Sequence, residues 1–342
     1  MIHKKFFGEK AEKVTPANLG EALQQAIEIE IATIPTYLFT YYSINRAPSQ
    51  QQMISSLTHA LLEIKTETPY NFDQATALAL DLSAEVMVFA NKAGALIMSV
   101  AIEEMLHMAL SSNLKQAVAG MPILNGRSPA TWPAELPGHQ PSLKINTSRL
   151  SMKQLETFLN IEKPMKPKQK DKLLLKAYIP YPTIGEFYEM VVDCLEKNPE
   201  LRYNTHAPQL VPGKGYYAQN NIDTLYYDKE HKPVFTNEDN SGDLICVADK
   251  TSALDAINLI VEQGEGQLVK DAPYLDADNN LIFSEVLQYD FSPKKGEESS
   301  HFEKFAEIYQ KYYALLTTCN RYPPKQAELF VMQTQRTLSC WR

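Results

Sequence analysis

Residues 100–113 read V-A-I-E-E-M-L-H-M-A-L-S-S-N, within a stretch whose apolar pattern predicts a helix from about Ser83 to Ala119. Glu104 and His107 are three positions apart, so a helix places both side chains on one face. Their helical neighbours are mainly apolar, and a buried carboxylate is costly unless it is paired or binds a cation. The stretch therefore predicts either a metal ion shared by Glu104 and His107, or a helix-surface pair with a satisfied core histidine.

The same E-x-x-H spacing recurs at Glu298 and His301, where we expect the last long helix at about 293–316. One such spacing alone is weak evidence, because Glu and His side chains often pair on helix surfaces. Two of them in long helices, however, match the donor set of a two-metal carboxylate centre in a four-helix bundle. Such a centre also needs a single Glu from each of the other two helices.

The first long helix is predicted over about 15–45, where apolar residues recur at helical spacing. It offers Glu28 and Glu30, which point about 200° apart on a helix. Glu30 has isoleucines as its helical neighbours and is predicted to point inward, whereas Glu28 is predicted to face water. Tyr37 follows on the face of Glu30. We interpret it either as core packing or as a hydroxyl that supports the metal ligands.

The rest of the chain predicts one elaborated domain over 1–342 that is mainly α, a four-helix bundle with extra helices and a small β insertion. Shorter helices are expected at about 50–66, 150–159, 183–198 and 252–266, and either or both of the last two would complete the bundle. A loop insertion is expected at 121–145, which is rich in Pro and Gly. Alternating residues within 210–250, ending at Leu244–Val247, predict a small antiparallel sheet.

Five motifs together resemble one family: A-I-E-I-E-I-A-T-I-P-T-Y-L (26–38), V-A-I-E-E-M-L-H-M-A-L-S-S-N (100–113), Y-P-T-I-G-E-F-Y (181–188), I-V-E-Q-G-E-G (260–266) and S-H-F-E-K-F (300–305). This is the ferritin-like domain also found in the iminophenyl-pyruvate dimer synthases of violacein-type pathways, and the similarity covers roughly 15–316. The resemblance implies a bundle that holds two metal ions, usually iron. Its implied ligands are Glu30, Glu104, His107, Glu298 and His301. The synthases are longer chains, so their dimerising chemistry does not transfer with the fold.

The remaining single Glu has two candidates. Glu186 follows Thr183 in T-x-x-E, so it is either a ligand or the second residue of a capping box. Glu265 lies between Gly264 and Gly266, where small residues allow close approach of the backbone, and it is either a ligand or an exposed acid in a turn. Both interpretations stay open for each residue.

Charge and composition exclude several classes of protein. A net charge of −8 without a polybasic run argues against nucleic acid and anionic membranes as partners. The N-terminus lacks the apolar core of a signal peptide, and the most apolar stretch contains charged residues. Four widely spaced cysteines suggest reduced thiols. We therefore expect a cytoplasmic protein, and the sequence leaves open whether it forms a homo-oligomer.

These observations favour an oxidoreductase that uses dioxygen or peroxide at a di-iron centre on a small organic substrate. Carboxylate and imidazole ligands suit two iron ions, and manganese is the alternative metal. The insertions add residues that an iron-storage bundle does not need, and they could cover a substrate pocket. The competing hypothesis is a non-catalytic protein in which metal only stabilises the bundle or iron is handled.

Overall fold

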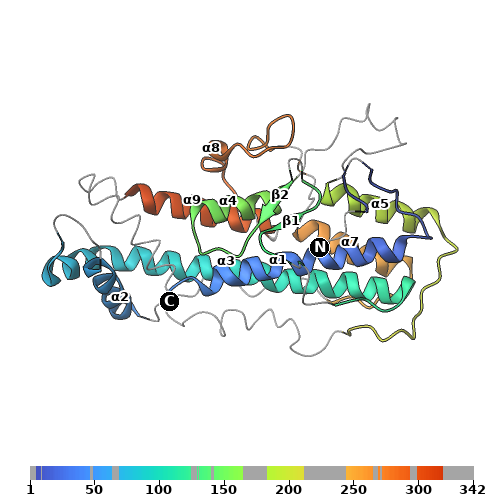
Figure 1. The fold of residues 1–342 in the computed structure, drawn as a ribbon, viewed down its shortest axis with the longest axis horizontal. Helices are drawn as coiled ribbons and strands as arrows, with labels where there is room; N and C mark the ends of the chain where they lie inside the picture. The colour runs from blue at the N-terminus through green and yellow to red at the C-terminus, as the bar shows by residue number, and fades with distance from the viewer. Residues whose placement is uncertain are drawn as a thin grey trace.

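Two long helices, α1 (Leu19–Tyr42) and α3 (Phe72–Ala119), lie side by side in the computed structural model (Figure 1). The structure describes residues 5–8, 10–46, 49–63, 69–124, 129, 131–139, 142–164, 183–211, 244–264, 269, 272–292 and 299–318. Gly20 at the start of α1 meets Ala119 at the end of α3, and a Cβ on Gly20 would lie 2.8 Å from the Ala119 Cβ. The two helices are therefore antiparallel and closely packed at this end.

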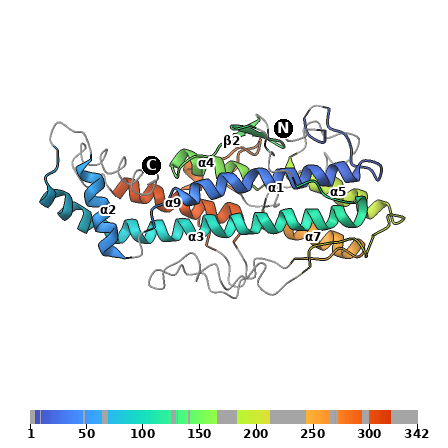
Figure 2. The same ribbon diagram turned by 60° about the horizontal axis from the view of Figure 1, so that its bottom comes forward.

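Helices α4 (Met152–Ile161) and α9 (His301–Thr318) pack together and complete the bundle, as both ribbon views show (Figures 1 and 2). Three aromatic rings join them to α1. Phe158 lies 4.8 Å from both Tyr37 and Phe305, and Tyr37 lies 5.1 Å from Phe305, measured between ring centroids. The mainly α bundle predicted from the sequence is confirmed.

Further helices extend the bundle at both ends. α2 (Gln50–Leu62) packs on α3, and α5 (Ile184–Lys197) packs on α7 (Lys250–Gln263), which also contacts α3 (Figure 2). A short helix, α8 (Phe283–Val286), precedes α9. The capping box predicted for Thr183 and Glu186 begins α5.

Two helices begin at places that differ from the sequence prediction. α3 begins at Phe72, well before Ser83, because Asn71 and Gln74 form a capping box there. α9 begins at His301 rather than near residue 293, because the Ser300 hydroxyl accepts from the Glu303 N–H while the Glu303 carboxylate accepts from the Ser300 N–H. His301 is thus the first residue of its helix.

Among the described residues, the two strands lie in the stretch predicted as a loop. β1 (Ala134–Leu136) and β2 (Leu143–Ile145) form an antiparallel pair in which Ala134 faces Ile145. Most of the predicted sheet, 212–243, lies outside the described residues. Its last predicted strand, Leu244–Val247, is not a strand, because the Gln209 side-chain amide bonds both the N–H and the C=O of Val247 in place of a neighbouring strand.

α3 is long and apolar enough to cross a membrane by length and composition. However, 78% of its most apolar window is buried inside the protein, as in the core helix of a bundle.

Candidate metal centre

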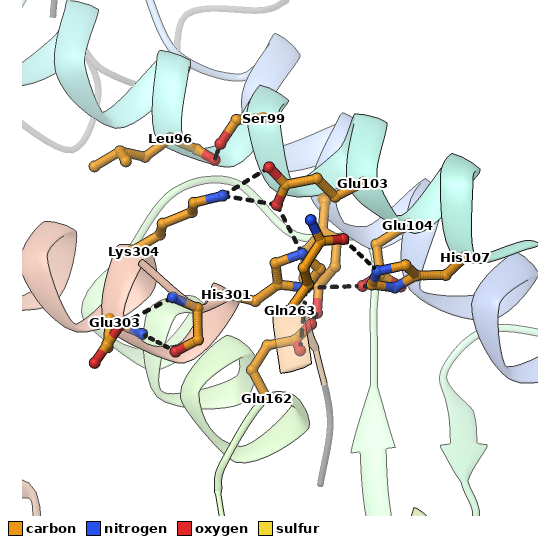
Figure 3. Close-up of polar contacts among 12 residues, drawn as sticks. Leu96, Ser99, Glu103, Glu104, His107, Glu162, Gln263, His301, Glu303 and Lys304 are labelled. Carbon is orange, nitrogen blue, oxygen red and sulfur yellow. Dashed lines mark hydrogen bonds and ion pairs between the residues drawn. The ribbon is translucent and has the colours of Figure 1, made fainter. Parts of the chain in front are cut away.

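Five buried side chains from four parts of the bundle converge on one point, and Figure 3 labels all of them except Glu30. They are Glu30 on α1, Glu104 and His107 on α3, Glu162 directly after α4, and His301 at the start of α9. Each is at most 5% exposed, so water screens their charges poorly. The cluster joins segments that are far apart in the sequence.

Glu104 lies between the two histidines. Its Oε1 is 3.0 Å from His301 Nδ1 and 3.8 Å from His107 Nδ1. The imidazole rings stack with their centroids 5.3 Å apart. One potential ligand atom from each of these three residues lies within 4.8 Å of the others. The α3 carboxylate is therefore placed to be shared between two positions.

Each histidine has a further carboxylate on its side of the cluster. His107 Nδ1 is 3.8 Å from Glu30 Oε2, and His301 Nδ1 is 3.4 Å from Glu162 Oε2. Both histidines thus turn Nδ1 toward carboxylate oxygens. The arrangement is one carboxylate and one imidazole on each side of Glu104.

Hydroxyl groups hold the three carboxylates in place. Tyr188 of α5 donates to Glu30 Oε1 over 2.8 Å, Tyr37 of α1 donates to Glu162 Oε1, and Thr33 donates to Glu104 Oε2. Tyr37 therefore combines the two roles considered for it, since its ring packs in the core and its hydroxyl supports a carboxylate. These bonds leave one oxygen of each carboxylate facing the histidines.

The outer nitrogens of the histidines have different partners. His107 Nε2 lies 3.0 Å from Gln263 Oε1, at the end of α7. His301 Nε2 lies 2.8 Å from Glu103 Oε2, and Lys304 Nζ is 2.7 Å from both oxygens of Glu103 (Figure 3). His107 Nε2 makes a hydrogen bond, whereas His301 Nε2 makes a close ion-pair contact without hydrogen-bond geometry within the described residues. Outer partners of both kinds help to orient the rings.

Crowding of acids in a buried space shifts their protonation. Burial and the neighbouring Glu104 raise the pKa of Glu30 well above its usual range, and the same two causes raise the pKa of Glu162. Burial also opposes ionisation of Glu103, but Lys304 and His301 nevertheless lower its pKa to about 2. The carboxylates that face the centre thus repel one another, and a cation there would stabilise their charged forms.

The histidines respond in opposite directions. Burial lowers the pKa of His107 to about 4, so this ring is neutral at pH 7. Burial acts the same way on His301, but Glu162, Glu103 and Glu104 together raise its pKa well above the usual value. His301 is thus a cation beside Glu104 and Glu162, as Lys304 is beside Glu103.

The donor set suits divalent metal. Three carboxylates and two imidazole nitrogens are the ligands that iron, manganese and zinc accept. The buried Nδ1 of His301 and Oε2 of Glu162 lie close together, yet neither makes a hydrogen bond of good geometry within the described residues. These two atoms are therefore better placed to bind one metal ion together than to bond to each other.

The residues predicted from the sequence divide into three groups. Glu30, Glu104, His107 and His301 come together in the cluster. Glu186 closes the α5 capping box, where Thr183 N donates to its Oε2 over 2.9 Å, the alternative considered for it. Glu265 and Glu298 lie outside the described residues, so as ligands they remain predictions, as does Glu186.

Glu162 is the residue that sequence reasoning missed. It follows the last residue of α4, where the chain Glu162-Lys163-Pro164 resembles the start of a solvated linker. A signal was present, because the buried positions Leu155, Phe158 and Leu159 form an apolar stripe whose next helical position is Glu162. Glu103, Lys304 and Gln263 were missed as well, since only the fold brings them to the histidines.

A family model matches most of the chain. The family model described as ferritin-like matches residues 23–310. Among solved structures, the chain is similar to a ferritin-like protein from Caulobacter vibrioides, with 20% identity, a TM-score of 0.42 and coverage of 96% of each chain. No curated protein matches the chain. Because the family model spans most of the sequence, the chain belongs to the ferritin-like family.

Proposed function

We propose that this cluster holds two iron ions and that the protein is an oxidoreductase, which uses dioxygen or peroxide to oxidise a small organic substrate. The observation that carries the proposal is the convergence of three carboxylates and two Nδ1 atoms from four separate segments. Manganese accepts the same donors and is the alternative metal.

In this proposal the ligands divide between two positions. Glu30 and His107 would hold one ion, Glu162 and His301 would hold the other, and Glu104 would bridge them. Iron bound there supplies electrons for the reduction of dioxygen or peroxide and leaves coordination positions open. The protein contributes a dry site, since all five side chains are buried.

The charge of the ligands supports the binding of two divalent metal ions. Glu30, Glu104 and Glu162 carry three negative charges when ionised, while Lys304 already neutralises Glu103. Two divalent ions bring four positive charges, so the filled centre is nearly neutral in a low-dielectric interior. Tyr188, Tyr37 and Thr33 keep the carboxylates oriented while the ions bind.

A small organic substrate is favoured over iron storage by the elements around the bundle. α5, α7 and the β1–β2 pair surround a bundle that already contains the whole cluster. The sequence resemblance to iminophenyl-pyruvate dimer synthases also favours an organic substrate. Their dimerising reaction is not transferred, because fold similarity alone does not carry chemistry.

A structural metal is the second candidate. Glu30, Glu104, Glu162 and His301 come from α1, α3, α4 and α9, so bound metal would cross-link all four segments of the bundle. That observation favours a stabilising role equally well. The two functions differ in whether the metal-loaded protein reacts with dioxygen.

The test is to load the metal-free protein with ferrous iron without air and then add oxygenated buffer. We expect two irons per chain and dioxygen consumption that His301→Ala abolishes. Glu85→Ala, on an exposed part of α3, is the matched control and should behave as wild type. Two bound irons with no dioxygen consumption would leave the structural role, and no bound iron would contradict both functions.

A further inference from the structure

The two sides of the cluster are built alike around their carboxylates. Glu30 accepts from the hydroxyl of Tyr188, and Glu162 accepts from the hydroxyl of Tyr37. Each histidine turns Nδ1 toward the centre, and Glu104 is common to both sides. Carboxylate support therefore does not distinguish the two positions.

The support behind the histidines does distinguish them. His301 Nε2 faces a carboxylate oxygen of Glu103, which is anchored by Lys304 through both oxygens, and all three side chains are buried. A carboxylate behind an imidazole makes the ring a stronger donor and fixes its orientation. This side is built on two helices, α3 and α9, that pack on each other.

His107 has weaker support. Its Nε2 faces the neutral amide of Gln263, whose own Nε2 is buried without a hydrogen-bond partner in the described part of the chain. Gly264 follows immediately, so close to the ring that a Cβ there would lie 3.2 Å from His107 Cε1. The ring is thus supported by one neutral bond and by contact with the end of α7.

We propose that the two metal positions are unequal, and that the position at His301 binds its ion more tightly because Glu103 and Lys304 support its imidazole. The inference rests on the proposed two-metal centre. Because outer partners of metal-bound histidines are worth about 10–100-fold in metal affinity, the His301 position should exceed the His107 position by that factor. At limiting metal, one ion per chain would occupy the His301 position.

Ions that share Glu104 also repel each other, so a stepwise titration of the wild type cannot by itself measure the inequality. Variants with one histidine avoid this effect. Titration of Mn²⁺ at pH 7.5, followed by calorimetry, should show one ion per chain for both His107→Ala and His301→Ala. After correction for the protons that binding releases, measured from the dependence of the heat on the buffer, we expect the chain that keeps His301 to bind Mn²⁺ about 10–100-fold more tightly.

Exchange of the outer partners tests the cause. In the His301→Ala background, Gln263→Glu should tighten Mn²⁺ binding about tenfold or more, because His107 then has a carboxylate behind it. In the His107→Ala background, Glu103→Gln together with Lys304→Met should weaken binding about 10–100-fold. The double change avoids an unpaired buried lysine, and circular dichroism verifies that each variant keeps its helices.

Equal Mn²⁺ affinities in the two single-histidine chains would overturn the inference. It would also be overturned if neither Gln263→Glu nor Glu103→Gln with Lys304→Met changed the Mn²⁺ affinity. Failure of the wild type to bind Mn²⁺ or Fe²⁺ would overturn the proposed function with it. Two unequal positions without dioxygen consumption would contradict only the oxidoreductase function, so the two failures are distinguishable.

Discussion

The α1–α3 half of the metal centre and the α4–α9 half are supplied by the chain in different ways. Glu30, Glu104 and His107 lie in the interiors of two long helices. Glu162 and His301 lie at helix ends, the first just after α4 and the second at the first position of α9. A ligand inside a helix is fixed by helical periodicity, whereas a ligand at a helix end depends on where the helix stops.

The largest effect is expected from the ligand that both halves share. Glu104→Ala should lower the affinity for both ions by more than about a hundredfold, since it removes a direct ligand rather than an outer partner. Glu28→Ala, two residues from Glu30 on α1 but only half-buried, is the control and should retain two ions. Metal analysis after dialysis measures both. Depletion in the Glu28 variant alone would show that the helix faces are wrongly assigned.

The second prediction concerns the acid of the α4–α9 half. Glu162→Ala should remove one ion per chain and leave the His107 position filled, because Glu162 is the carboxylate beside His301 Nδ1. Glu298 and Glu265, the acids predicted as ligands from the sequence, are changed to Ala in parallel. Metal content by mass spectrometry decides between these acids. Loss of an ion in the Glu298 or Glu265 variant, with retention in the Glu162 variant, would contradict the assignment.

The same contrast explains how far the sequence could predict this protein. The α1–α3 half was predictable because Glu30, Glu104 and His107 interrupt apolar stripes in long, strongly periodic segments. His301 was found through its E-x-x-H spacing, but that argument assumed a helix running through residue 298. α9 begins only at His301, because the capping box of Ser300 and Glu303 sets its start.

Glu162 was harder to predict for a related reason. The apolar pattern ends near Leu159, and a charged residue next to Lys163 is typical of a solvated helix end. Only tertiary packing brings the end of α4 beneath His301 and the Tyr37 hydroxyl. The same limit applies to Val247, whose backbone bonds to the Gln209 side chain rather than to a strand, which no local pattern encodes.

The third prediction is a different pH dependence of the two halves. Ions at the His301 position must displace protons from His301 and Glu162, whose pKa values are both raised. An ion at the His107 position must displace a proton only from Glu30, because His107, with a pKa of about 4, is already neutral. Each proton displaced changes metal affinity by about tenfold per pH unit below the pKa of its group.

Metal affinity should therefore rise with pH in both halves, and more steeply at the His301 position. Mn²⁺ titrations of His107→Ala and His301→Ala from pH 5.5 to 7.5 would measure the two slopes, and the chain that keeps His301 should show the steeper one. An equal slope for both variants, or affinity that falls with pH, would contradict these protonation states.

The smallest effect is expected from the tyrosine hydroxyls, the feature in which the two halves are alike. Tyr37→Phe removes the donor to Glu162 but keeps the ring packed against Phe158 and Phe305, and Tyr188→Phe does the same for the donor to Glu30. A hydrogen bond contributes about 0.5–1.5 kcal/mol when its acceptor is neutral and about 1.5–3 kcal/mol when it is charged, and the raised pKa values of Glu30 and Glu162 place the metal-free protein between these limits. Each variant should therefore lose about 1–2 kcal/mol in the free energy of unfolding of the metal-free protein, and only a few-fold in metal affinity. Urea unfolding and Mn²⁺ titration measure the two quantities.

Each hydroxyl bonds a carboxylate of only one half. Tyr37→Phe should therefore weaken metal binding only at the His301 position, and Tyr188→Phe only at the His107 position. Weakening of both ions by either variant would show that the halves are coupled through more than Glu104.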